Sequence, residues 1–249
     1  MRVLEGKNVL LTGANRGIGL VTLKEMARKG ADIWACARTY SQEFEIEIQR
    51  LMDENNVKIT PVYFDLRNEE EVKRAVSDIL KEKRTIDVLV NNAGVPYGAT
   101  MQMTSIKDLK DVYEINFFAQ IYLTQLVSKS MIRQKKGVII NLASVGGIEA
   151  TEGYLAYGSS KAALIYATKV MAKELGKYGI RVNAIAPGLV DTRMGHFKTE
   201  KELEKVLDRT ALGRMAFPEE IADAIVYMAS EQASYVTGHV LVVDGGRTL

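Results

Sequence analysis

The sequence predicts an α/β fold, a Rossmann-type doubly wound parallel sheet of about seven strands with helices on both faces. Three observations support this prediction. Short apolar stretches alternate with amphipathic ones along the 249 residues. The apolar stretches are continuous runs, which is typical of parallel strands buried on both faces. The first run ends in a glycine-rich turn, as the first strand of a dinucleotide-binding unit does.

The first half of the chain contains four predicted strands. The apolar runs that indicate them are residues 9–12, 33–37, 57–64 and 87–91. Residues 18–29 have helical spacing, and Gly30 suits the end of that helix. A polar helix is predicted at about 41–55. Asn68 is the predicted N-cap of the next helix, and Glu71 would complete a capping box with it.

The second half contains three further strands and the longest helices. Its apolar runs are residues 138–144, 180–186 and 240–243. Long helices are predicted at about 105–134 and 154–176, and Pro218 suits the first turn of a helix that ends at Ala229. The charged insertion at about 189–216, with its own short helix at 200–208, is a predicted lid over a site. No linker divides the chain, so we expect residues 1–249 to form a single domain.

The composition argues against a nucleic-acid-binding, membrane-spanning, disulfide-bonded or metal-binding protein. The formal net charge of +2 gives no reason to expect a nucleic acid or a membrane surface as partner. No apolar run approaches the roughly 18 residues of a membrane span, and the first residues lead directly into a strand rather than a signal peptide. Cys36 is the only cysteine, which excludes an internal disulfide, and a cytoplasmic location is the resulting expectation. With two histidines and no Cys/His cluster, no metal site is expected.

Three side chains indicate proton transfer to or from an alcohol oxygen. Ser144 ends I-I-N-L-A-S, and Tyr157 and Lys161 lie in Y-G-S-S-K. On a helix, residues four apart share a face, so the Lys161 ammonium would act on the Tyr157 phenol and lower its pKa. Taken alone, Y-x-x-x-K more often marks an ordinary helix surface. The pattern gains its meaning from the motifs around it.

The turn T-G-A-N-R-G-I-G at 12–19 indicates a dinucleotide site. Its glycines permit a tight turn, and the helix that follows would direct its N-terminal amides at a pyrophosphate. The strand at 33–37 is followed by Arg38, where an NAD site would have a carboxylate. Arg38 and Arg16 would instead bind a 2′-phosphate, although two solvated surface arginines are the alternative. The sequence therefore favours NADP(H) over NAD(H).

Taken together, these motifs resemble the short-chain dehydrogenase/reductase family over essentially the whole chain. The matching segments are T-G-A-N-R-G-I-G, F-D-L at 64–66, N-N-A-G at 91–94, Asn116 in E-I-N-F, Ser144, Y-G-S-S-K, P-G-L-V-D-T at 187–192 and V-D-G-G at 243–246. Their order and spacing agree throughout.

The resemblance implies a role for each matching residue. Tyr157 would be the general acid for ketone reduction, Lys161 would bind the nicotinamide ribose and lower the Tyr157 pKa, Ser144 would polarise the carbonyl, and Asn116 would kink its helix and anchor a water. The implied catalytic residues are Asn116, Ser144, Tyr157 and Lys161. The implied cofactor-binding residues are Gly13, Asn15, Arg16, Gly17, Ile18, Gly19, Arg38, Asp65, Leu66, Asn92, Ala93, Gly94, Tyr157, Lys161, Pro187, Gly188, Val190 and Thr192. Asn91 would instead tie neighbouring strands together.

Within the family, the chain is most similar to 3-oxoacyl-acyl-carrier-protein reductases. This implies an NADPH-dependent enzyme that reduces a carbonyl to a secondary alcohol. The first expected substrate is a 3-oxoacyl thioester carried by an acyl carrier protein. Lys135 and Lys173 would dock that carrier near the site entrance, with ordinary solvated lysines as the equal alternative. His196 and Phe197 of the lid are candidate substrate contacts, although a lone loop histidine is more often simply exposed. An alcohol, sugar or steroid dehydrogenase and a non-catalytic cofactor sensor stay open as alternatives. The resemblance also implies a homotetramer that pairs through the helices at 105–134 and 154–176 and through the C-terminal segment.

Overall fold

The computed structural model describes residues 2–82, 84–195 and 200–249, and it confirms the predicted fold class. One seven-stranded sheet has the order β3-β2-β1-β4-β5-β6-β7, and neighbouring strands are parallel throughout. The strands are β1 (Asn8–Thr12), β2 (Asp32–Ala37), β3 (Ile59–Tyr63), β4 (Val88–Asn91), β5 (Gly137–Leu142), β6 (Ile180–Pro187) and β7 (Val240–Val243). The strand order reverses between β1 and β4, and ligands of such sheets bind at the carboxyl ends of the strands beside this point.

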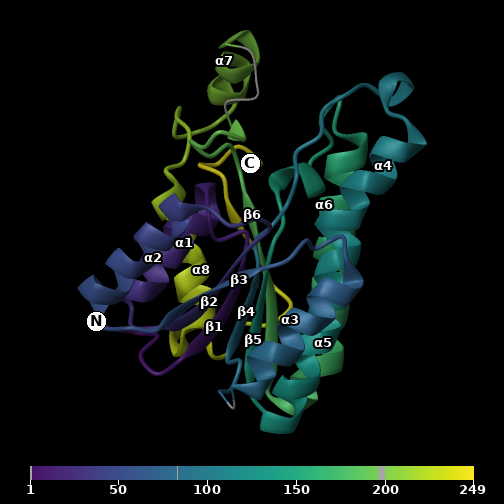
Figure 1. Cartoon of the computed structure of the whole chain (residues 1–249). Helices are drawn as coiled ribbons and strands as arrows, with labels where there is room; N and C mark the ends of the chain where they lie inside the picture. The colour runs from purple at the N-terminus through teal and green to yellow at the C-terminus, as the bar shows by residue number, and fades with distance from the viewer. Residues whose placement is uncertain (1, 83, 196–199) are drawn as a thin grey trace.

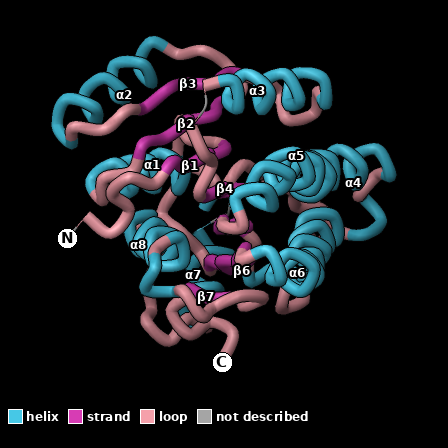
Figure 2. Tube along the Cα trace, turned by 90° about the horizontal axis from the view of Figure 1, so that it is seen from below, coloured by secondary structure: helices cyan, strands magenta, loops and turns pink. Residues whose placement is uncertain are grey.

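Helices cover both faces of the sheet (Figures 1 and 2). One face carries α1 (Gly17–Arg28), α2 (Gln42–Asn55) and α8 (Pro218–Ala229), and the other carries α3 (Glu69–Lys81), α4 (Ile106–Tyr113), α5 (Ala119–Gln134) and α6 (Leu155–Leu175). The short helix α7 (Glu200–Asp208) stands beyond the carboxyl ends of the strands, at the top of Figure 1. It belongs to the predicted lid segment.

Each face has its own apolar core. On the α1 and α8 side, Leu23 and Ile225 pack with Val9 and are fully buried. On the α5 side, Leu123 and Val127 pack with Trp34 and are fully buried too. Two cores on one sheet explain why the strands are apolar on both faces, without the alternation of a half-exposed sheet.

The helix predicted at 105–134 contains a local change of winding. After α4, residues Glu114–Phe118 form a π-helix, and α5 then continues to Gln134. Asn116 lies in the middle of this widened turn and is fully buried. The expected kink at Asn116 therefore takes the form of a π-bulge, a feature that often marks functional sites in helices.

Three local predictions are wrong in detail. β5 ends at Leu142, so Ser144 lies in the loop after the strand and not within it. β3 begins at Ile59, two residues later than predicted. The capping box is only half formed, because the Glu71 carboxylate accepts hydrogen bonds from the Asp65 backbone and the Asn68 side chain instead of the Asn68 backbone.

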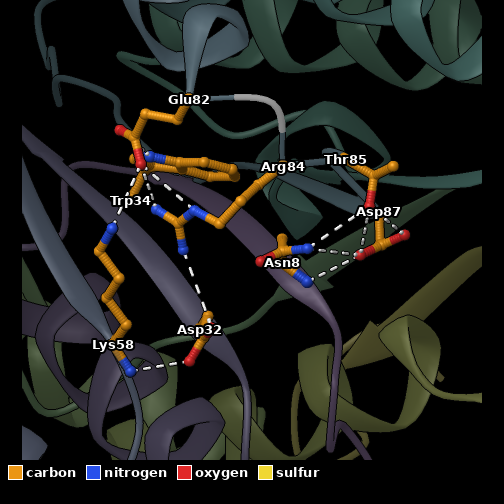
Figure 3. A network of polar contacts seen from close by, with 8 residues as sticks. All are labelled: Asn8, Asp32, Trp34, Lys58, Glu82, Arg84, Thr85 and Asp87. Carbon is orange, nitrogen blue, oxygen red and sulfur yellow. Dashed lines mark hydrogen bonds and ion pairs between the residues drawn. The ribbon is translucent and has the colours of Figure 1, made fainter.

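The amino ends of the strands are closed by a polar network, shown in Figure 3. The Arg84 guanidinium lies 4.2 Å from the Trp34 ring centroid, and Glu82 accepts hydrogen bonds from both side chains. Asp32 accepts from the Lys58 backbone at 2.7 Å. These contacts fix the end of the sheet that lies opposite the predicted site.

β3 is an edge strand and carries Pro61, paired in register with Ala35 of β2. Among the described residues, no helix is long and apolar enough to span a bilayer. Within the same residues, no group of His, Cys, Asp or Glu side chains is arranged to hold a metal ion.

Candidate active site

The glycine turn lies where β1 ends and α1 begins. Gly13 has a φ of +65°, a conformation that side chains with a Cβ rarely adopt. A Cβ on Gly19 would stand 2.0 Å from the Gly13 carbonyl oxygen, so only glycine permits this approach of helix to strand. The first amides of α1 have no partner within the helix and point out of its N-terminus, where they suit a phosphate.

Asn92, the residue after the neighbouring strand β4, holds the turn. Its Nδ2 donates to the Thr12 and Gly13 carbonyl oxygens at 2.8 and 3.1 Å. The Thr12 hydroxyl in turn accepts from the backbone amides of Asn92 and Ala93. The Asn92 side chain is therefore engaged in shaping the turn, a structural role beyond the implied one of binding the cofactor. Ala93 and Gly94 continue the loop from this anchor.

Arg16 and Arg38 lie on the rim of the same turn. The Ala14 amide donates to the Cys36 carbonyl at 3.0 Å, which joins the turn to the end of β2, two residues before Arg38. Both guanidinium-bearing residues are exposed, and neither has an ion-pair or hydrogen-bond partner among the described residues. Their charges are available to an anionic group bound there.

The next loop along the sheet carries Asp65 and Leu66. The Phe64 amide donates to the Ala37 carbonyl at 3.1 Å, which ties the loop to the end of β2. One Asp65 oxygen accepts from the Arg67 backbone at 3.0 Å. The loop thus lies beside Arg38, on the side of the turn where an adenine would be expected.

The loop after β5 brings Ser144 to helix α6. Residues Val145–Gly147 form a 3-10 turn capped by the Ser144 hydroxyl, which accepts from the Gly146 amide at 3.1 Å. A Cβ on Gly147 would lie 2.7 Å from the Lys161 carbonyl carbon, and one on Gly158 would lie 2.6 Å from the Gly146 oxygen. These glycines let the loop and the helix touch backbone to backbone, which places Ser144 beside Tyr157.

Tyr157, Lys161 and Asn116 meet on one side of α6. Lys161 is 3% exposed, its Nζ donates to the Leu142 carbonyl at 2.6 Å, and it lies 6.0 Å from the Tyr157 ring centroid. Asn116 exchanges two hydrogen bonds with the Val95 backbone and donates to the Ser160 hydroxyl at 3.2 Å. A Cβ on Gly94 would stand 3.4 Å from Lys161 Nζ and 3.2 Å from Asn116 Oδ1, so the loop after β4 closes over both groups.

The electrostatics differ from the expectation at one point. Burial raises the pKa of the Tyr157 phenol, while the Ser144 hydroxyl opposes that rise. Burial also lowers the pKa of Lys161 to about 8. The predicted lowering of the Tyr157 pKa by Lys161 is therefore not found: burial dominates at the phenol, and the Lys161 ammonium donates to the Leu142 carbonyl.

The base of the lid faces the glycine turn. Pro187 ends β6, the Gly188 amide donates to the Val243 carbonyl, and the backbones on either side of Val190 pair with Ala216. A Cβ on Gly17 would lie 3.8 Å from Thr192 Cγ2, so Thr192 stands directly beside the start of α1. The predicted cofactor residues from six separate segments thus converge at the carboxyl ends of the strands.

Lys135 and Lys173 do not flank this site. Both are exposed, and Lys135 precedes the first residue of β5 while Ser144 follows its last. Lys173 lies twelve residues, about 18 Å of helix, beyond Lys161. In the single chain, Lys135 and Lys173 are therefore ordinary solvated lysines, the alternative stated above. His196 and Phe197 lie outside the described residues.

Sequence reasoning identified Asn91 as a strand tie but missed its partners. Asn91 Nδ2 donates to Asn141 Oδ1 and to the Thr124 hydroxyl, both at 2.9 Å, and Asn141 donates to the Thr168 hydroxyl at 2.8 Å. These groups are buried and join β4, β5, α5 and α6 beneath the candidate catalytic residues. Asn141 lies in the same I-I-N-L-A-S motif that Ser144 ends, which was the available signal.

These residues fit a nicotinamide dinucleotide. Glycines leave room at the start of α1, free amides and two unpaired arginines suit phosphates, and Thr192 and Lys161 lie farther along the same edge. A hollow of about 540 Å³ elsewhere, lined among others by Lys7 and Lys136, lies at the opposite ends of the strands and shares none of these residues.

Comparisons with known proteins agree with this geometry. A family model described as Enoyl-(Acyl carrier protein) reductase matches residues 13–248. The 3-oxoacyl-[acyl-carrier-protein] reductase of Thermotoga maritima is 39% identical over 243 residues, 98% of each chain. The 7alpha-hydroxysteroid dehydrogenase of Bacteroides fragilis is 36% identical over 253 residues, 100% of this chain and 97% of the relative. A gluconate 5-dehydrogenase from Burkholderia cenocepacia, solved in complex with NADP and tartrate, superposes with a TM-score of 0.91 at 29% identity over 99% of this chain and 97% of that one.

Proposed function

The chain belongs to the short-chain dehydrogenase/reductase family of NAD(P)-dependent oxidoreductases, and from this premise we propose that it reduces a carbonyl to a secondary alcohol with NADPH. We propose a 3-oxoacyl thioester, carried by an acyl carrier protein, as the first substrate class to test. The observation that supports the proposal is the meeting of Ser144, Tyr157 and Lys161 beside the glycine turn.

In the proposed reaction the protein supplies the proton and the geometry. The bound nicotinamide supplies a hydride to the carbonyl carbon. The Ser144 hydroxyl, fixed by its loop, is positioned to hydrogen-bond the carbonyl oxygen as negative charge grows on it. The Tyr157 hydroxyl then protonates that oxygen. Because burial raises the Tyr157 pKa, the phenol is in its protonated form at neutral pH, and this is the form that reduction needs.

Lys161 assists from beneath. Its ammonium lies 6.0 Å from the Tyr157 ring centroid and would stabilise the phenolate left after proton transfer. It would also bind the hydroxyls of the nicotinamide ribose. Asn116 holds the loop after β4 against Lys161 through its hydrogen bonds to Val95. In this proposal the amide keeps the lysine aligned without touching the substrate.

NADP(H) is proposed over NAD(H) because of the two rim arginines. Arg16 and Arg38 are exposed and unpaired among the described residues, at the place where the adenosine ribose of a dinucleotide would lie. A 2′-phosphate would accept fork-shaped, charge-assisted hydrogen bonds from them. The gluconate 5-dehydrogenase similar to this chain was solved with NADP, which supports the same choice.

The test follows NADPH absorbance with acetoacetyl thioesters, a steroid ketone and a keto-sugar acid. We expect the thioester to be turned over faster than the other two substrates. Tyr157→Phe should lower turnover by about 10²–10⁴-fold and leave NADPH affinity nearly unchanged. Preferred turnover of the steroid or sugar acid would favour the second candidate function, to which the steroid and gluconate dehydrogenase relatives point. Cofactor binding with no turnover of any ketone would contradict an enzymatic role.

We also propose a homotetramer. Phe118 and Tyr166, on the helices expected to pair, are 53% and 72% exposed. Aromatic side chains so exposed on long helices are suited to an interface between copies. Leu164 of the same helix is fully buried and belongs to the core of the single chain. Gel filtration with light scattering should give the mass of four chains, whereas the mass of one chain would contradict this proposal.

A further inference from the structure

Glu149 connects three segments that are far apart in the sequence. It follows the 3-10 turn that Ser144 caps, and its amide donates to the Val145 carbonyl at 2.8 Å. Its Oε1 accepts from Arg209 Nη2 at 2.5 Å, one residue after the end of α7. Its Oε2 lies 3.9 Å from Arg247 Nε in the C-terminal segment. One carboxylate thus meets the catalytic loop, the lid and the chain end.

The two ion pairs differ in their surroundings. The Arg209 side chain is largely exposed. Its ion pair with Glu149 therefore contributes little to stability, and salt weakens it. The Arg247 side chain is only 10% exposed, yet its guanidinium donates no hydrogen bond to a described residue. Glu149 Oε2 is buried and likewise has no hydrogen-bond partner. A buried carboxylate oxygen without a donor needs a reason, because it carries an energetic cost.

The backbone around these arginines is already joined. The Leu212 amide donates to the Gly245 carbonyl at 3.0 Å, and a Cβ on Gly245 would lie 3.0 Å from Thr210. Asp244 accepts from the Thr248 amide and hydroxyl, which folds the C-terminal segment into a turn beside Gly245. The lid and the chain end therefore form one unit, and the Glu149 carboxylate joins that unit to the loop that carries Ser144.

We propose that Glu149 is a positioning residue that holds the lid and the C-terminal segment closed over the substrate side of the catalytic loop. It acts through Arg209 and Arg247 rather than on the substrate. The proposal rests on the proposed function only in naming what the lid covers. Closure favours substrate binding, so weakening it raises KM for the carbonyl substrate more than it lowers kcat.

The test compares Glu149→Gln, Arg209→Gln and the double variant with the unmodified chain. The matched control is Glu54→Gln, which removes one partner of an exposed ion pair to Arg50 on α2, far from the lid. Amide hydrogen exchange over residues 203–215 reports lid opening without any substrate. Steady-state kinetics with the best carbonyl substrate gives kcat and KM separately.

We expect exchange over 203–215 to become about two- to fivefold faster in each single variant, as the loss of a partly exposed ion pair implies. The double variant should match Glu149→Gln, because that single change already removes the contact to Arg209. One molar NaCl should produce a similar increase in the unmodified chain, and Glu54→Gln should leave the lid unchanged. KM should rise by a similar factor.

Unchanged exchange in Glu149→Gln, or effects of the two single variants that simply add, would overturn the proposal. So would an equal loss of kcat and kcat/KM with no rise in KM. The exchange measurement needs no turnover, so its result stands even if no ketone is reduced, and a failure of the proposed function is thereby told apart from a failure of this one.

Discussion

Replacing Lys161 with methionine tests how desolvation shapes the candidate site. The ammonium is buried, and its pKa falls from 10.5 to about 8. Between those two values the unfolded chain binds more protons than the folded one. The free energy of unfolding therefore rises with pH through this window, as the folded protein is relieved of a buried charge.

The magnitude follows from the two pKa values. At about 1.4 kcal/mol for each pKa unit, a fall from 10.5 to about 8 corresponds to ~3 kcal/mol. Methionine removes this penalty but leaves the Leu142 carbonyl without its donor, which costs about 1–3 kcal/mol. At pH 7 the two effects largely cancel, so Lys161→Met should be about as stable as the unmodified chain or slightly more stable. Its turnover should be lost.

The assay is urea denaturation of both proteins at one protein concentration, at pH 7, 8, 9 and 10. The difference between the two unfolding free energies should change by ~3 kcal/mol across the full window, with the unmodified chain gaining stability relative to Lys161→Met as pH rises. Other titrating groups cancel in the difference. A difference that stays constant from pH 7 to 10 would refute the idea that burial lowers the pKa of this lysine.

Three further predictions concern the cofactor site and its support. Arg38→Ser should weaken NADPH binding by about 10–100-fold, because a charge-assisted hydrogen bond is worth about 1.5–3 kcal/mol. NADH binding, measured by the same fluorescence titration, should stay nearly unchanged. Equal losses for both cofactors would contradict the 2′-phosphate role. Gly19→Ala should destabilise the fold by at least about 1–3 kcal/mol, because its Cβ would meet the Gly13 carbonyl oxygen, and a thermal melt with an unshifted midpoint would show that the turn can relax. Asn91→Leu should cost about 1–3 kcal/mol in chemical denaturation, because the Asn141 oxygen loses its buried donor, and a neutral result would mean that a water replaces the amide.

Much of the fold was accessible from the sequence because its signals are local and repeated. Continuous apolar runs predicted parallel strands buried on both faces, and the glycine turn predicted where the first strand meets its helix. The end of β5 was misplaced because Ala143 and Ser144 follow the apolar run without a Gly or Pro to end it, while the backbone turn of Val145–Gly147 takes them out of the strand. Sequence spacing carries no information about such a turn.

The electrostatics of the candidate site were less accessible. Helical spacing predicted that Tyr157 and Lys161 share a face, and they do. It did not predict that the Lys161 ammonium would bind the Leu142 carbonyl, nor that burial would raise the Tyr157 pKa. Both depend on how tightly the loops after β4 and β5 close over α6. That packing arises from segments distant in the chain, and so does the meeting of Glu149 with Arg209 and Arg247.

Pro61 has a consequence for how this protein behaves at high concentration. An edge strand ordinarily offers a row of donors and acceptors to any extended segment nearby, and aggregation grows from such rows. A foreign strand laid along β3 would find a ring nitrogen without hydrogen at Pro61, in the middle of the only five residues available to it. Growth of intermolecular sheet is therefore blocked on this flank, and the opposite flank, β7, is the one that must be shielded by other means.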